Sequence, residues 1–174
     1  GYPANKLFQF LSAQFGETET LKLMKKYKVG TSKYWDGATV FWQTDNQNKV
    51  RTGKIMLYNS ETGKRIKEPY NHVTWVHSVL HKEDYNLKQC FFGEHLLPED
   101  KSLPVALVES EKTALIASYY LSQFLWIASG GKNGCFYANN LSVLAGRSVV
   151  LFPDLEATDY WHSKIGLMKS YGIK

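Results

Sequence analysis

Two apolar segments of the chain end in carboxylates. Val105–Val108 runs directly into Glu109, and Val149–Phe152 is followed within four residues by Asp154 and Glu156. Apolar runs of this length are typical of strands that are buried on both faces of a parallel sheet. Carboxylates that follow such strands lie at the carboxyl edge of the sheet, where open α/β folds place their sites. The two segments therefore predict a divalent-metal site with oxygen ligands.

The spacing of the acids indicates how they would share an ion. Asp154 and Glu156 are two residues apart, so in an extended segment both would point to one side, with Glu109 opposite them. Mg²⁺ prefers a few carboxylates, several waters and phosphate oxygens, and this arrangement suits nucleotidyl transfer. We expect these three acids to be catalytic and to hold Mg²⁺ or Mn²⁺. Glu111 is interpreted as a partner of the helix dipole, with metal ligation as the alternative.

The elements that must position these acids follow one another from residue 104. Strands alternate with helices there, which predicts βαβ units and a parallel sheet, that is, an α/β lobe over residues 104–174. The expected elements are a strand at 105–108, a helix at about 111–122, a strand at 124–128, a glycine-rich loop at 129–134, a helix at about 137–144, a strand at 148–152 and a helix at about 157–170.

Residues 1–103 predict a separate α+β lobe. Apolar spacing favours helices at 5–15 and 17–29, which Gly16 and Gly30 would end. Residues 38–67 read as antiparallel strands with turns near 45–48 and 60–63. The segment 75–80 fits a strand or a helix, and 92–97 fits a short helical turn.

Composition excludes several classes of protein. Hydrophobic residues make up 44% and charged residues 21%, as in folded globular proteins, and the net charge of +5 leans toward a polyanionic partner. No apolar run approaches the roughly 20 residues of a membrane span. Cys90 and Cys135 are isolated and form no metal-binding pair, which predicts a reduced, cytoplasmic protein without structural zinc. Gly1 in place of Met suggests a piece of a longer protein.

Two groups of residues are candidates for phosphate contacts. Lys112 and Lys132, with Gly130 and Gly131 beside the latter, could meet phosphates near the acids. The alternatives are a surface lysine and a structural turn, and the glycines do not match a nucleotide P-loop.

The second group surrounds the predicted hairpin and consists of basic residues interleaved with Trp42 and Tyr58. Cations beside aromatic rings are the ingredients of a groove for single-stranded nucleic acid, although hairpin aromatics are more often packed. The basic residues are Arg51, Lys54, Lys64 and Arg65.

The acidic segments resemble the two motifs of the Toprim domain. Leu107-Val108-Glu109-Ser110-Glu111-Lys112-Thr113-Ala114 is similar to the first motif and Phe152-Pro153-Asp154-Leu155-Glu156 to the second. Bacterial-type primases, type IA and type II topoisomerases, some nucleases and some repair proteins share this domain. The resemblance is specific over 104–160 and looser over 30–103, where the chain is similar to primase cores. Toprim-like proteins of Bacteroides-type mobile elements look most similar.

The resemblance implies a fold and a function. It implies a Toprim-like α/β lobe after a primase-core-like α+β lobe, and a primase-like nucleotidyltransferase that uses Mg²⁺ or Mn²⁺ in mobile-element DNA replication. The implied partners are DNA, RNA or nucleotides, and a helicase or other replication protein, without a membrane.

The chain departs from the Toprim pattern in three places. Glu156 stands where the family has Asp, Ala157 and Thr158 stand where a glycine is usual, and the chain stops where a final strand would begin. They imply a weaker metal site or a truncated domain. A catalytically faded nucleic-acid-binding module, a Toprim nuclease and a small-molecule enzyme on an unrelated doubly wound sheet remain alternatives.

Overall fold

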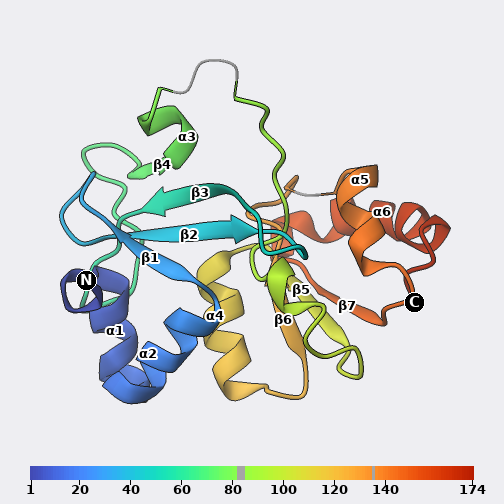
Figure 1. The fold of residues 1–174 in the computed structure, drawn as a ribbon, viewed down its shortest axis with the longest axis horizontal. Helices are drawn as coiled ribbons and strands as arrows, with labels where there is room; N and C mark the ends of the chain where they lie inside the picture. The colour runs from blue at the N-terminus through green and yellow to red at the C-terminus, as the bar shows by residue number, and fades with distance from the viewer. Residues whose placement is uncertain (82–84, 135) are drawn as a thin grey trace. The chain divides into compact units, whose positions relative to one another are not determined.

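A computed structural model of the chain describes residues 1–81, 85–134 and 136–174 (Figure 1). The chain divides into two compact units. Unit 1 comprises Gly1–Trp42 and Thr52–Lys88, and unit 2 comprises Gln43–Arg51 and Gln89–Lys174. The boundary between residues 103 and 104 stays a prediction. Cys135, one of the two isolated cysteines, lies outside the described residues.

The N-terminal elements build a four-stranded sheet in the order β1-β2-β3-β4, in which β1 pairs antiparallel with β2 and β3 pairs antiparallel with β4. The predicted first helix and hairpin strands are present. These elements are η1 (Tyr2–Ala4), α1 (Lys6–Phe15), α2 (Glu17–Lys26), β1 (Val29–Ser32), β2 (Ala38–Thr44), β3 (Val50–Met56), β4 (Val73–Trp75) and α3 (Val76–Val79).

The start of α1 is tied to the sheet by one buried side chain. Asn5 caps the helix, because its Oδ1 accepts a hydrogen bond from the N–H of Phe8 at 3.0 Å. Its Nδ2 donates to the carbonyl of Gly30 at 3.0 Å, and its Oδ1 also accepts from the hydroxyl of Thr39 at 2.9 Å. Gly16 ends the helix with φ at 81°, a conformation that glycine adopts without strain.

The predicted helix at 17–29 is too long. The helix α2 ends at Lys26, and Lys28 has φ at 52°, which ends helical geometry. Gly30 therefore does not stop a helix but lies in β1, where it pairs with Val40. Antiparallel pairing with β2 explains this, because a long-range partner overrides the local helical pattern. The undecided segment 75–80 contains the last residue of β4 and then one turn of helix, α3.

The C-terminal elements confirm the predicted alternation. They form a three-stranded parallel sheet in the order β6-β5-β7. The elements are η2 (Glu94–Leu96), β5 (Val105–Val108), α4 (Glu111–Tyr120), β6 (Leu125–Ala128), α5 (Ala138–Leu141), η3 (Ser142–Leu144), β7 (Val149–Phe152), η4 (Leu155–Ala157) and α6 (Thr158–Ser170).

The two acid-bearing strands differ in burial. Every residue of β5 is buried, as the sequence predicts for a strand covered on both faces. The same prediction is wrong for β7, in which Val150 and Phe152 are exposed. Exposed residues alternate with half-buried ones along β7, so one face of this strand is uncovered, whereas helix α4 packs against β5 and β6.

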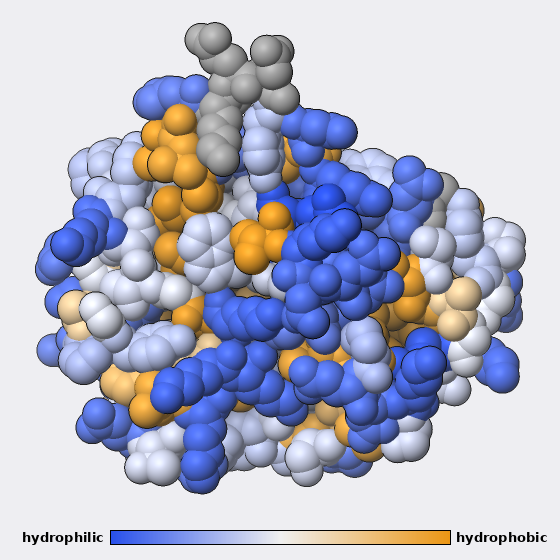
Figure 2. All heavy atoms as spheres, viewed as in Figure 1, coloured by the Kyte–Doolittle hydropathy of each residue, from blue (hydrophilic) through white to orange (hydrophobic). Residues whose placement is uncertain are grey.

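The face drawn in Figure 2 is largely polar. Hydrophilic side chains cover much of the face drawn in Figure 2, and hydrophobic side chains appear between them in scattered patches. In the described parts of the chain, none of the helices has the length and apolar character that crossing a bilayer requires.

Candidate functional site

The central strand and the helix after it hold Glu109. Val108, the last residue of β5, is level with Ala128 of β6 and Phe152 of β7. Ser110 then caps α4, because its Oγ accepts a hydrogen bond from the N–H of Thr113 at 3.2 Å. A buried strand and a capped helix therefore fix the backbone on both sides of Glu109.

Asp154 follows β7 and reaches Glu109 directly. Its N–H donates to Oε1 of Glu109 at 3.1 Å. Parallel pairing accounts for this contact, since the carboxyl ends of β5 and β7 lie at one edge of the sheet. The acids at 109 and 154 therefore lie together, as the sequence predicts.

The geometry of the Asp154–Glu156 pair differs from the prediction. The segment is not extended, because Leu155–Ala157 forms the 3-10 helix η4 and the N–H of Ala157 donates to the Asp154 carbonyl at 2.9 Å. Strand alternation therefore does not bring the two acids to one side. The helical turn that follows Asp154 sets the relative orientation of the two acids instead.

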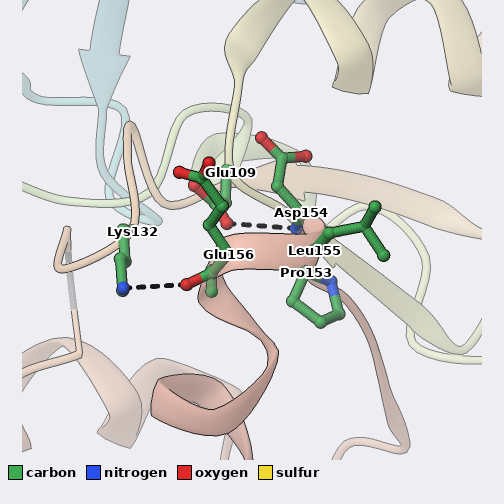
Figure 3. A pocket seen from close by; sticks show the side chains of 7 residues that line it. Glu109, Lys132, Pro153, Asp154, Leu155 and Glu156 are labelled. Atoms are coloured by element: carbon green, nitrogen blue, oxygen red, sulfur yellow. Dashed lines mark hydrogen bonds between the residues drawn. The ribbon is translucent and has the colours of Figure 1, made fainter.

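These acids line a single open pocket of about 510 Å³. Figure 3 shows the three carboxyl groups pointing to the same side of the strand ends, while the ammonium of Lys132 points to a backbone carbonyl. Three carboxylates and the cation of Lys132 therefore share this pocket. It is lined by Glu109, Lys132, Pro153, Asp154, Leu155, Glu156 and Ala157.

The glycine-rich loop is anchored to the end of β5. The N–H of Ser129 donates to the Val108 carbonyl at 2.9 Å, and the N–H of Gly130 donates to the Glu109 carbonyl at 2.9 Å. A Cβ at Gly134 would lie 2.1 Å from the carbonyl oxygen of Ser129, so only glycine fits there. The turn therefore has a structural reason for its glycines.

The loop presents Lys132 to the pocket. Its Nζ donates to the carbonyl of Glu156 at 2.8 Å, and its own carbonyl accepts from Nε1 of Trp161 at 3.0 Å. Trp161 is fully buried in α6 and packs against Phe136, with 4.9 Å between ring centroids. A core tryptophan thus supports the lysine at the pocket.

Burial and charge act together on Glu109. Partial burial raises the pKa of its carboxyl group, and the nearby charges of Asp154 and Glu156 raise it further. The hydrogen bond from the Asp154 N–H and the charge of Lys132 oppose this shift. The net effect is a raised pKa, so the carboxyl group of Glu109 holds its proton more strongly than an exposed glutamate does.

The donor set suits a hard divalent cation, but its present geometry is incomplete. Oxygen donors from carboxylates are those that Mg²⁺ and Mn²⁺ take, and Mg²⁺ commonly uses only one or two of them together with waters. Within residues 1–81, 85–134 and 136–174, however, no three His, Cys, Asp or Glu side chains are arranged to hold an ion. Ligation by Glu109, Asp154 and Glu156 therefore stays a prediction that needs some side-chain rotation.

Of the residues predicted to meet phosphates, only Lys132 lines the pocket. Lys112 is half-buried in α4 outside the pocket lining. The N–H of Gly130 is used by the Glu109 carbonyl, and Gly131 lies in the loop with φ at 146°. Arg51 of unit 2 donates from Nε to Asp45 at 2.7 Å.

The other predicted cations belong to unit 1. The ammonium of Lys54 lies 5.7 Å from the ring centroid of Trp75, and the side chains of Lys64 and Arg65 are exposed. Of the aromatics predicted to flank them, Tyr58 is buried and Trp42 packs against the sheet core. The predicted groove therefore does not contain these two rings as exposed platforms.

Two pocket features were missed by the sequence analysis. Leu155 is 96% exposed in the pocket lining, and Trp161 supports Lys132 from below. The position of the apolar Leu155 between two acids could have indicated the first feature. Nothing local could indicate the second, because Trp161 and Lys132 are 29 residues apart.

The carboxyl group of Glu94, in unit 2, is deeply buried outside the pocket. Glu94 is 2% exposed, and its oxygens accept hydrogen bonds from the N–H groups of Asn46 at 3.2 Å and Phe91 at 3.1 Å. Burial raises its pKa to about 7, with a smaller contribution from the charge of Asp45. The two backbone hydrogen bonds and Arg51 oppose the shift. Glu94 thus joins the 45–49 turn to the segment before η2.

This pKa predicts a pH-dependent stability. The folded chain keeps the Glu94 proton between pH 4.5 and about 7, whereas the unfolded chain releases it, so the free energy of unfolding should fall as pH rises through that window. The fall should be at most about 3–4 kcal/mol. Urea unfolding across this range should show it, and Glu94→Gln should flatten the slope. The exposed Glu99→Gln is the matched control, and an equal slope in wild type and Glu94→Gln would refute the assignment.

Comparison with known proteins places the chain in a family. The model of the Domain of unknown function (DUF6371) matches residues 5–155. The chain belongs to this family. The DUF6371 match includes Glu109 and Asp154 of the pocket. None of the curated proteins matches the sequence significantly.

Two solved structures have a similar fold. The Aquifex aeolicus primase (zinc binding and RNA polymerase domains) has a TM-score of 0.54 and 14% identity, with 94% of this chain and 40% of that chain covered. The primase fragment of the bacteriophage T7 primase-helicase protein has a TM-score of 0.52 and 15% identity, with 84% and 55% covered. This DUF6371 chain therefore has a primase-like mixed α/β fold and spans about half the length of these structures.

Proposed function

We propose that this chain is the Toprim-containing part of a primase-like protein that transfers nucleotides with Mg²⁺ or Mn²⁺. The observation that carries the proposal is the meeting of Glu109 and Asp154 at the ends of two parallel strands, with Glu156 in the same pocket. The fold shared with two primase structures supports it. The motif resemblance supports a role in replicating mobile-element DNA, beside a helicase or another replication protein.

Each pocket residue has a role in this proposal. Glu109 and Asp154 would hold the ion, and Glu156 would complete the set after its side chain turns toward them. A bound divalent ion would stabilise the charge that develops on transferred phosphate oxygens. Lys132 would leave the Glu156 carbonyl, to which it is 2.8 Å away, and bind a phosphate oxygen. The exposed Leu155 would contact the apolar face of a sugar or base.

A product assay tests the reaction. The chain is incubated with single-stranded DNA, labelled ribonucleotides and Mn²⁺, and the products are separated by electrophoresis. We expect short labelled oligonucleotides that vanish with EDTA and with Asp154→Asn. The exposed Asp159→Asn in the first turn of α6 removes the same charge outside the pocket lining and should keep full activity. Shortened DNA without synthesis would show a nuclease instead.

The binding-only alternative has one observation in its favour. Across the described residues, no three potential ligand side chains are placed to hold an ion. A chain that binds DNA with steep salt dependence, but gives neither synthesis nor cleavage with either metal, would be this faded module. The product assay and a salt titration of DNA binding together separate the alternatives.

A further inference from the structure

Four rings contact one another in unit 1, and we call them the aromatic cluster: Tyr34, Trp35, Tyr70 and His72. Trp35 meets Tyr34 edge-on at 4.7 Å between centroids and meets His72 edge-on at 5.1 Å. Tyr70 stacks on His72 at 4.3 Å with 20° between planes. Nε1 of Trp35 also donates to the hydroxyl of Tyr70 at 3.3 Å. The rings therefore form one connected surface feature.

The sheet topology brings these rings together. The loop between β1 and β2 carries Tyr34 and Trp35, and the loop between β3 and β4 carries Tyr70 and His72. The antiparallel pairings β1/β2 and β3/β4 and the strand order put both loops at the same end of the sheet, on the left in Figure 1. Trp35 also packs on the core formed by Ala38, Val40 and Ile55, so the cluster has a rigid base.

Two rings of the cluster are exposed to solvent. Tyr34 is 52% exposed and Tyr70 is 55% exposed, whereas His72 is 8% exposed behind them. Nδ1 of His72 is buried and makes no hydrogen bond among the described residues. A buried polar atom without a partner is costly.

Charge indicates the class of ligand. Unit 1 contains twelve Lys and Arg against seven Asp and Glu, so it carries the whole net charge of +5, whereas unit 2 has nine of each and is neutral. The loops that carry the rings contribute four cations (Lys33, Lys64, Arg65 and Lys67) and three acids (Asp36, Glu61 and Glu68). Exposed rings beside cations favour an anionic ligand with flat apolar faces.

We infer that the aromatic cluster stacks bases of single-stranded nucleic acid, with Tyr34 and Tyr70 as platforms and the neighbouring cations as phosphate contacts. Proteins that bind such strands without sequence preference stack successive bases on exposed aromatic rings and bind the phosphates with cations. This goes beyond the proposed function, because it needs neither a metal ion nor the carboxylate pocket. A proline-rich peptide could also lie on such rings. It would gain nothing from the excess of cations in unit 1, whereas the phosphates of a nucleic acid would.

Binding of two labelled strands tests the inference. The affinity of the chain for each labelled strand is measured by fluorescence anisotropy in EDTA. One strand is an oligothymidylate of about 16 nucleotides and the other is an abasic strand of the same length. Wild type should bind the first at least about fivefold more tightly. Tyr34→Ala combined with Tyr70→Ala should remove that preference, while Tyr34→Phe combined with Tyr70→Phe should keep it. Tyr120→Ala in unit 2, at a side chain that is 65% exposed, is the matched control and should change nothing.

The outcomes separate this inference from the proposed function. Equal affinity of wild type for the two strands, or an unchanged preference in the double alanine variant, would overturn the stacking surface. Tighter binding of a proline-rich peptide than of the oligothymidylate would also overturn it. Melting curves of the double variant check that the fold is intact. Binding is measured in EDTA, so a chain that gives no metal-dependent product can still prefer the strand with bases, and loss of the reaction leaves the stacking surface standing.

Discussion

Glu109→Gln should abolish the stabilisation that Mn²⁺ gives to the wild-type chain. At a free Mn²⁺ concentration of about 100 times the dissociation constant, the wild type should gain about 2.7 kcal/mol, and the variant should gain almost nothing. Glutamine keeps an oxygen that can accept the Asp154 N–H, so the strand-end contact survives while the charge is lost. Thermal melts over a Mn²⁺ titration measure the difference.

The controls for this variant use both charge and pH. Glu99→Gln removes an exposed acid outside the pocket and should respond to Mn²⁺ like wild type. Without metal, Glu109→Gln should melt at or slightly above the wild-type temperature, because the charges of Asp154 and Glu156 no longer act on a third carboxylate. The stabilisation that Mn²⁺ gives to the wild type should weaken as pH falls. The raised pKa of Glu109 lets protons compete with the ion for its carboxylate. Equal Mn²⁺ responses of wild type and Glu109→Gln would refute metal ligation.

Trp161→Ala should cause the largest loss of stability among these variants. Trp161 is fully buried, packs against Phe136 and donates to the Lys132 carbonyl at 3.0 Å. Truncating a buried tryptophan costs about 3–5 kcal/mol through lost burial and the cavity left behind. Urea unfolding at fixed pH measures it.

A graded second variant separates packing from hydrogen bonding at this position. Trp161→Phe keeps a ring but leaves the Lys132 carbonyl without its donor, and should cost less than the alanine change. Both variants should loosen the support of Lys132 and therefore weaken phosphate contacts more than Tyr120→Ala does. A loss below about 1 kcal/mol for Trp161→Ala would show that α6 does not hold the loop.

Local pattern predicted the elements that depend on their own residues. The strand Val105–Val108 and the helix that begins at Glu111 occur where the apolar run and the alternation of strands with helices predict them. The meeting of Glu109 and Asp154 was also predictable, because neighbouring parallel strands have their carboxyl ends at one edge of the sheet.

Features that depend on distant partners were not predictable in the same way. Gly30 follows a helical pattern but pairs with Val40 in a strand, and Val150 and Phe152 are apolar yet exposed because one face of β7 is uncovered. The aromatic cluster joins residues such as Trp35 and Tyr70 that are 35 positions apart. Only the order of strands in the sheet reveals these contacts.

The most direct measurement of the central claim is a crystal structure of the chain soaked with Mn²⁺, with anomalous diffraction data. We expect one anomalous peak in the pocket, with a carboxylate oxygen of Glu109 and one of Asp154 both in its coordination shell at about 2.0–2.2 Å. The soak should use a Mn²⁺ concentration that supports product formation. If the side chains of Glu109 and Asp154 are then ordered and no anomalous peak lies between them, the account is contradicted.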